Sequence, residues 1–222
     1  MPPPSRSRSG GTAADVAAAL RRQIVSRELP PGAKLREIDL AARLGTSRSR
    51  IREALVALEE RGLVERVPNR GAIVPRLEAE QAADLYDVRE VLEGLCARLA
   101  TLRGPKARWE KALKAFRGPL ARLVDRGDLD AYVDAYEAFH AEMVDAAGNP
   151  ILATLLASIC DRTQAVVRRT ILVPGRAAAG LRQHQRMLEA MAAGDADRAE
   201  RLRRETMRSA KAALERYRHY VL

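Results

Sequence analysis

The first 77 residues contain an order of segments that few folds accommodate. Val16, Leu20 and Ile24 recur at every fourth position, which predicts an amphipathic helix over residues 12–28. The prolines of "LPPG" at 29–32 end this helix, because proline cannot donate to the helical hydrogen-bond ladder. Two further helical segments and then two β-prone segments follow. We therefore expect three short helices and a hairpin in this part of the chain.

The second and third helices are separated by a short connection. Leu40, Ala41 and Leu44 share one face of the second helix, and Gly45 after it suits a left-handed carboxyl-terminal cap. Ser47 can then accept a hydrogen bond from the first free amides of the third helix. These residues predict a tight turn between the two helices.

Apolar and charged residues lie on different faces of the third helix. Ile51, Leu55 and Leu58 form the stripe that docks it on the first two helices, and Gly62 closes it. The residues left facing outward, at or near its amino terminus, are Ser47, Arg48, Ser49 and Arg52. A run of exposed arginines and serines occurs on solvated surfaces as well as at binding sites. The neighbouring elements therefore decide which of the two is meant here.

A hairpin is predicted after the third helix. The β-prone segments "LVERV" at 63–67 and "AIV" at 72–74 flank a turn in which Asn69 and Gly71 can adopt positive φ, and Pro75 ends the unit. Helix, helix, tight turn, helix and hairpin is the order of a winged helix-turn-helix. In such folds the amino end of the third helix enters the major groove of DNA.

The rest of the chain, from Glu78 to its end, is predicted to be helical. Its breaks are "GP" at 104–105, "RGD" at 126–128, "GNP" at 148–150, "VPG" at 173–175 and "AGD" at 193–195. They delimit about six helices, each long enough for an all-α bundle. The sequence thus predicts a mainly α protein with a small β-hairpin wing.

Positive charge is concentrated near the amino terminus. Residues 1–78 contain 15 Lys and Arg against 9 Asp and Glu, a net +6 out of the +10 of the whole chain. This asymmetry favours an anionic partner such as nucleic acid, although a liberal use of arginine by the organism also contributes. The stretch "MPPPSRSRSGG" at 1–11 is predicted to be a disordered basic tail that contacts DNA phosphates without sequence preference.

The cysteines and the hydropathy of the chain indicate the cellular compartment in which the protein works. Cys96 and Cys160 lie in apolar helical contexts without CxxC spacing, which is typical of free thiols in a reducing environment. No apolar run approaches the roughly 20 residues of a membrane span, and residues 1–11 lack the hydrophobic region of a signal peptide. We expect a cytoplasmic protein without membrane association.

Residues 29–74 resemble the DNA-binding domain of GntR-type transcriptional regulators. The matching stretches are "LPPGAKL", "LAARLGTSRSRIREAL" and "GLVERVPNRGAIV"; Ser49 and Arg50 stand where the family usually has threonine and proline. The resemblance implies that Arg48 and Arg52 contact bases or phosphates, since the arginine fork matches guanine O6 and N7. It also implies a wing turn in the adjacent minor groove. The predicted DNA contacts are Arg36, Ser47, Arg48, Ser49, Arg50, Arg52, Asn69, Arg70 and Gly71.

The helical remainder resembles the FCD ligand-binding domain of the FadR subfamily. The matching segments are "LYDVREVLEGLCARLA" at 85–100, "FHAEMVDAAGNPIL" at 139–152 and "HQRMLEAMAAGDADRAERLRRE" at 184–205. The resemblance implies a DNA-binding domain over 12–77 and an effector-binding and dimerisation domain over 78–222. The predicted effector contacts are Arg89, Tyr136, His140, Asn149, His184 and Thr206. Arg89 is the expected carboxylate anchor unless it pairs with Glu93 on the surface, and Asn149 has a helix-capping role as an equal alternative.

Many FCD domains hold a divalent metal with one Asp and three His, and the present chain keeps only part of this set. Tyr136 stands four residues before His140, where the family has Asp, and Thr206 stands where it has the last His. His140 and His184 match the other two positions, and Glu137 is the nearby carboxylate with a suitable direction. Zinc or nickel requires three or four protein ligands, so a metal held by His140 and His184 competes with the interpretation of both as hydrogen-bonded pocket residues.

Together these features predict a homodimeric, ligand-responsive regulator that recognises a pseudo-palindromic operator. Regulators of this family are most often repressors, so the resemblance implies a repressor. It also implies that the effector is a small acidic metabolite. A constitutive or architectural DNA-binding protein with a degenerate pocket is the main alternative. A metal-dependent enzyme is another, but neither a complete ligand set nor a nucleophile–base pair supports it, and we expect no enzymatic activity.

Overall fold

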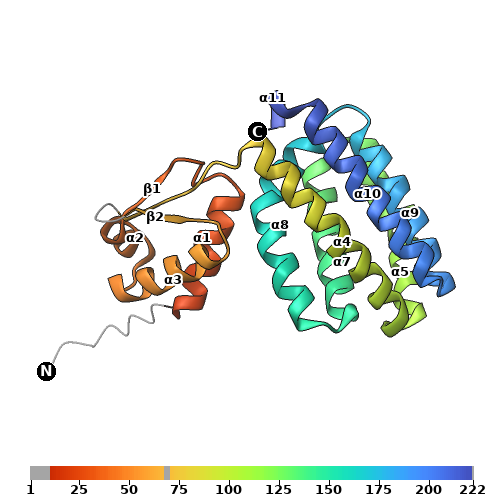
Figure 1. Ribbon diagram of the computed structural model, residues 1–222, viewed down its shortest axis with the longest axis horizontal. Helices are drawn as coiled ribbons and strands as arrows, with labels where there is room; N and C mark the ends of the chain where they lie inside the picture. The colour runs from red at the N-terminus through yellow and green to blue at the C-terminus, as the bar shows by residue number, and fades with distance from the viewer. Residues whose placement is uncertain (1–10, 68–70, 222) are drawn as a thin grey trace, which may run out of the picture. The chain divides into compact units, whose positions relative to one another are not determined.

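The computed structural model describes residues 11–67 and 71–221, whose course is shown in Figure 1. Almost all of the predicted basic tail, and the predicted wing residues Asn69 and Arg70, lie outside these ranges. The chain folds into two compact units that are divided between Arg76 and Leu77.

The described part of the first unit contains three helices: α1 (Ala13–Val25), α2 (Glu37–Leu44) and α3 (Arg48–Glu60). Thr12 and Asp15 form a capping box at the start of α1, each side chain accepting from the other residue's backbone N–H. The helix ends at Val25 rather than at residue 28, because Arg27 adopts a φ of 63°, outside the right-handed helical region. Among the fully buried side chains that hold the unit together are Leu20, Leu35 and Ile51.

A three-stranded antiparallel sheet completes the first unit. The strands are β1 (Lys34–Leu35), β2 (Glu65–Val67) and β3 (Gly71–Ile73), with β3 in the middle. Residue pairs such as Glu65 with Ile73 set the register of the predicted hairpin. Strand β1 was not predicted, because two residues are too few to show an alternating pattern.

The second unit is helical throughout its described residues. Its helices are α4 (Ala79–Arg103), α5 (Lys106–Arg117), α6 (Pro119–Arg126), α7 (Leu129–Ala147), α8 (Pro150–Thr170), α9 (Arg176–Ala193), α10 (Ala196–Arg216) and α11 (Arg218–Val221). All five predicted breaks separate helices. Two of the six predicted helices are each divided once more. The break before α6 follows from Pro119, which lacks the N–H needed to continue α5, and the second lies at Tyr217.

The long helix α4 organises this bundle by packing against α7, α8 and α10, while α5 and α10 both pack against α9 (Figure 1). The core contains the only tryptophan of the chain, Trp109, which is fully buried. Among its other buried side chains are Phe116, Phe139, Met143, Leu156, Met187 and Leu188. In the described ranges, no helix is both long enough and apolar enough to cross a membrane.

Candidate functional site

The amino end of α3 is fixed by the turn that precedes it. Gly45 adopts a φ of 62°, as predicted for a left-handed cap, and its N–H bonds to the carbonyl of Ala41. Ser47 then caps α3 by accepting the backbone N–H of Arg50 at 3.3 Å. The turn therefore sets the angle at which the amino end of α3 leaves the body of the unit.

The two faces of α3 have opposite environments. Ile51 and Leu55 are buried in the unit core. The exposed residues at or near the amino end are Ser47, Arg48, Ser49, Arg50 and Arg52. The side chains of Arg48 and Arg52 are 60% and 58% exposed. The predicted outward-facing residues thus lie together on one accessible surface, which we call the α3 surface.

Glu37 of α2 binds both of these arginines. Its carboxylate accepts from Arg52 Nε at 3.0 Å and from Arg52 Nη2 at 2.9 Å, and Arg48 Nη2 lies 3.7 Å away. The hydrogen bonds from Arg52 lower the pKa of Glu37. Glu37 therefore orients Arg52 before any ligand arrives and leaves the Arg48 guanidinium less constrained. This cross-helix contact was not predicted, because the partners are 15 positions apart and belong to different helices.

The other predicted DNA contacts lie near the same elements. Arg36 is exposed at the amino-terminal cap of α2, and the Ser49 hydroxyl donates to Glu53 at 3.1 Å. Gly71 opens β3 with a φ of 89°, and a Cβ at this position would lie 2.9 Å from the carbonyl oxygen of Leu35. A side chain at Gly71 would therefore disturb the pairing of β3 with β1.

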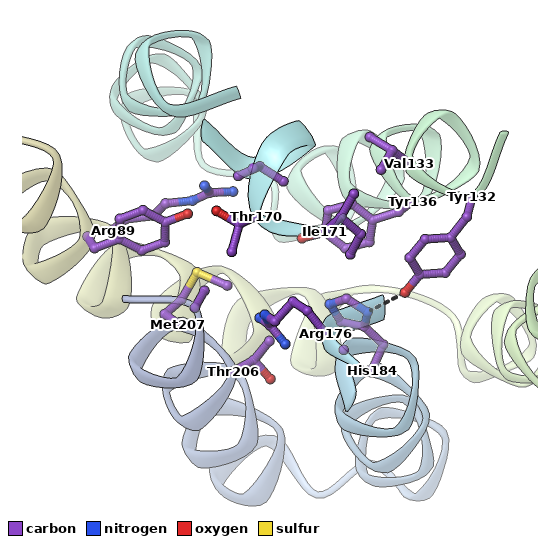
Figure 2. A pocket seen from close by; sticks show the side chains of 14 residues that line it. Arg89, Tyr132, Val133, Tyr136, Thr170, Ile171, Arg176, His184, Thr206 and Met207 are labelled. Atoms are coloured by element: carbon purple, nitrogen blue, oxygen red, sulfur yellow. Dashed lines mark hydrogen bonds between the residues drawn. The ribbon is translucent and has the colours of Figure 1, made fainter. Parts of the chain in front are cut away.

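A cavity in the helical unit brings together residues of α4, α7, α8, α9 and α10 and of the turn after α8 (Figure 2). Its lining residues are Tyr86, Arg89, Tyr132, Val133, Tyr136, Val167, Thr170, Ile171, Arg176, Gly180, His184, Thr206, Met207 and Ala210. The lining thus combines apolar side chains with phenols, hydroxyls and two guanidinium groups, a composition typical of small-molecule sites.

Four of the six predicted effector contacts line this cavity: Arg89, Tyr136, His184 and Thr206. The other two lie elsewhere. Asn149 caps α8 by accepting the backbone N–H of Leu152 at 3.1 Å, which is the capping alternative considered for it. His140 bonds to Glu93 rather than lining the cavity.

Behind the cavity lies a buried ionic cluster centred on Glu93, whose side chain is fully buried. Its carboxylate accepts from Arg89 Nε at 3.1 Å, from Arg203 Nη2 at 2.6 Å and from His140 Nε2 at 3.0 Å. Burial acts to raise the pKa of Glu93, but Arg203, His140 and Arg89 outweigh it and hold that pKa well below its usual range. Glu93 is therefore ionised and ties three helices together.

The cluster changes the expected roles of two residues. Arg89 does pair with Glu93 at i,i+4, but the pair is buried rather than on the surface, and Arg89 also donates to the Thr163 hydroxyl at 3.1 Å. Glu137, expected as the carboxylate near His140, instead accepts from Gln164 and Arg168. That expectation was wrong, because the partner of His140 is Glu93 of α4, a residue remote in the sequence.

Aromatic contacts connect the cavity to the cluster. The Tyr136 ring stacks on His184 with a centroid distance of 4.6 Å, and the Tyr136 hydroxyl accepts from Arg203 at 2.8 Å. Burial, together with the charges of Arg203 and Arg176, lowers the pKa of His184 well below its usual value. His184 is therefore neutral at pH 7, with Nδ1 lying 3.4 Å from the Tyr132 hydroxyl.

Comparison with known proteins assigns both units to one family. Residues 12–74 match the model of bacterial regulatory proteins of the gntR family, and residues 84–209 match the FCD domain. The chain belongs to the GntR family. It is a DNA-binding transcriptional regulator with an FCD domain, and members of this family act by binding DNA, not as enzymes.

Individual GntR relatives cover most of the chain. An HTH-type transcriptional regulator of Streptomyces ambofaciens is 30% identical over 92% of this chain and 85% of its own length. One from Agrobacterium vitis is 35% identical over 57% of this chain and 75% of its own. The solved structure of a GntR regulator from Rhodococcus sp. RHA1 superposes with a TM-score of 0.70 at 27% identity, covering 92% of this chain and 98% of that one. Other relatives carry the names of repressors and of activators.

The residues at the metal positions of FCD domains do not suit a metal here. His140 and His184 have different partners, Glu93 and Tyr132. In the part of the chain that the structure describes, Glu93, His140 and Cys160 do place potential ligand atoms within 4.8 Å of one another. However, both oxygens of Glu93 already accept from guanidinium groups, and burial raises the pKa of the Cys160 thiol, which disfavours the thiolate that binds zinc.

Proposed function

We propose that the chain is a homodimeric, ligand-responsive repressor that binds a pseudo-palindromic operator in the cytoplasm. The observation that carries the DNA-binding part is the α3 surface, where five polar side chains stand exposed at or near the amino end of a docked helix. This is the end that a recognition helix inserts into the major groove. The exposed guanidinium groups of Arg48 and Arg52 match both guanine edges and phosphates.

The ligand-responsive part rests on the cavity. It lies within the FCD domain, and its lining combines an apolar wall with hydrogen-bond donors and two arginines. These features support a small acidic effector, and we propose that its binding changes the affinity for the operator. The coupling follows from linkage: a ligand that binds one arrangement of the dimer more tightly shifts the population toward it.

Operator binding in the presence and absence of organic acids tests this proposal. If the protein is a ligand-responsive repressor, an effector acid should change its affinity for the operator at least fivefold, which is the lower end of typical allosteric coupling. A protein that binds one operator sequence with the same affinity whatever acid is added would support the alternative of constitutive binding. That alternative draws support from the departures at Tyr136 and Thr206.

An apolar stripe on α4 supports the homodimer. Val88, Val91, Leu95 and Leu102 are between 36% and 61% exposed and lie three, four and seven positions apart, so they share one face of the helix. The stripe extends over about 20 Å at the rise of an α-helix. A second copy can cover such a stripe with its own, because a two-fold axis pairs identical surfaces. Dimerisation would also supply the two α3 surfaces that paired half-sites require.

Charges introduced into the stripe are expected to dissociate the dimer. The double variant Val91→Asp/Leu95→Asp places four carboxylates in the buried interface of the pair, so we expect monomers at micromolar concentration where the wild type is dimeric. Sedimentation equilibrium without DNA measures this. Ile38→Asp, at an exposed apolar residue of the DNA-binding unit, is the matched control and should remain dimeric. A wild type that is monomeric, or a double variant that stays dimeric, would contradict the assignment of the stripe.

A further inference from the structure

Arg176 differs from the other buried or half-buried arginines near the cavity, because no carboxylate neutralises it. It is the first residue of α9, it is partly buried, and its Nη1 donates to Gln183 Oε1 at 3.3 Å. Within the described ranges, no Asp or Glu oxygen lies within ion-pair distance of it. Arg89 and Arg203, in contrast, both bond to Glu93. Arg176 therefore keeps most of its five N–H donors available.

The surroundings of Arg176 contain hydrogen-bond donors but no negative charge. Among the described residues that line the cavity there are two arginines, Arg89 and Arg176, and no carboxylate. Behind them, the carboxylate of Glu93 already accepts from Arg89 and Arg203. Glu93 is therefore shared by two guanidinium groups, and Arg176 adds a third guanidinium that does not contact it.

The ionisation of the neighbouring groups does not neutralise Arg176. Burial lowers the pKa of Arg176, and the groups that oppose this shift are the phenols Tyr86, Tyr132 and Tyr136. Burial raises the pKa of all three phenols, so they stay neutral at pH 7. An arginine side chain stays protonated in proteins. The cavity therefore holds a partly buried cation that an anion would stabilise.

We propose that Arg176 binds the carboxylate of a small organic acid in this cavity, and that its guanidinium does so without a metal ion. This inference rests on the proposed effector role of the cavity. Arg89 was the anchor expected from the sequence, but its Nε and Nη1 are already used by Glu93 and Thr163. In Figure 2, Arg176 is drawn among Thr206, His184 and Met207, so a carboxylate on Arg176 would lie between polar and apolar walls.

The shape of the cavity limits the size of the acid. Its volume is about 60 Å³, and one buried water needs about 10–15 Å³ by this measure, so about four to six water-sized groups fit. Gly180, inside α9, also lines the cavity, and a Cβ at this position would stand 3.5 Å from Arg176 Nη1. The wall provided by Val133, Ile171 and Met207 favours a short apolar chain. The class of ligand is therefore a short-chain monocarboxylate.

The experiment measures stabilisation of the full chain by such acids after treatment with a chelator. Urea unfolding is followed by the fluorescence of Trp109, which reports on the helical unit. Propionate and butyrate are compared with propionamide and butyramide at equal ionic strength. We expect both acids to raise the unfolding midpoint in a saturable way and the amides to leave it unchanged, because binding to the native state alone stabilises that state.

Variants of Arg176 and of a neighbour on the same helix complete the test. Arg176→Met should weaken the binding of propionate and butyrate at least tenfold, whereas Arg176→Lys should keep part of it. Arg182→Met, at an exposed arginine of α9, should bind both acids like the wild type. Without acid, Arg176→Met should unfold at the same urea concentration as the wild type or higher, since it removes a partly buried charge that no carboxylate pairs with.

Several outcomes would overturn the assignment. They are equal stabilisation by acids and amides, no stabilisation of the wild type, unchanged binding in Arg176→Met, or binding that chelation abolishes and zinc restores. Failure of the proposed function has a different signature. If the acids bind through Arg176 but leave operator affinity unchanged, the ligand-responsive role fails and the Arg176 site stands.

Discussion

Replacement of Glu93 by glutamine is expected to lower the free energy of unfolding of the helical unit by about 3–5 kcal/mol, the usual cost of breaking a buried ion pair. The carboxylate is fully buried and accepts from Arg89, Arg203 and His140. Without its charge, two buried guanidinium groups lose the carboxylate that both of them contact. Urea unfolding followed by Trp109 fluorescence measures the change in the helical unit.

Two comparisons separate this effect from a general loss of packing. Glu90→Gln on the same helix breaks only the exposed pair with Arg208 and should leave the midpoint almost unchanged. Arg203→Met should lower the free energy of unfolding less in the Glu93→Gln variant than in the wild type, because the ion pair between Arg203 and Glu93 is already broken in that variant. If Glu93→Gln lowers the free energy of unfolding no more than Glu90→Gln does, the ionic cluster does not stabilise the helical unit.

The pH dependence has a defined sign. The pKa of Glu93 lies well below its ordinary value of 4.5, so its charge stabilises the folded state fully above that value. The difference between the wild type and Glu93→Gln should therefore shrink as the pH falls below about 4.5.

The double variant Arg48→Ala/Arg52→Ala is expected to lose specific DNA binding while its helical content stays unchanged. Each arginine that contacts a guanine contributes about 5- to 150-fold to discrimination, and the pair stands on the exposed face of α3. A fluorescent operator duplex titrated at fixed salt measures the loss. If an arginine contacts phosphate only, its removal should weaken all sequences equally and reduce the salt dependence.

Two further variants sharpen this prediction. Arg61→Ala removes one positive charge at the opposite end of α3 and should retain specific binding. Glu37→Gln frees Arg52 from its bidentate partner, so it should raise affinity for all DNA and reduce the preference for the operator. If Arg48→Ala/Arg52→Ala binds the operator with the affinity of the wild type, α3 is not the recognition helix.

The features predicted correctly from the sequence are those encoded within a few residues. The left-handed Gly45, the cap at Ser47 and the buried Ile51 each follow from local spacing, and together they define how α3 is presented. The helix breaks at glycine and proline were found for the same reason. The break at Pro119 shows the same signal, a proline next to Gly118, but it lies inside a segment of otherwise continuous helical periodicity.

The ionic contacts were not predictable in the same way. Arg203 and Glu93 are 110 positions apart, and Arg52 and Glu37 are 15 apart, so no periodicity connects either pair. Arg176 directly follows the predicted "VPG" break, where an arginine is usually solvated. It is enclosed because residues of α4, α7, α8 and α10 line the same cavity. The sequence therefore located the α3 surface well and the cavity only through its family resemblance.

The most direct test of the account is selection of DNA from a random duplex pool by the full chain, followed by sequencing of the retained molecules. The account predicts one enriched motif with two related half-sites for the wild type and none for Arg48→Ala/Arg52→Ala. A wild type that enriches no motif, or a double variant that enriches the same one, would contradict it.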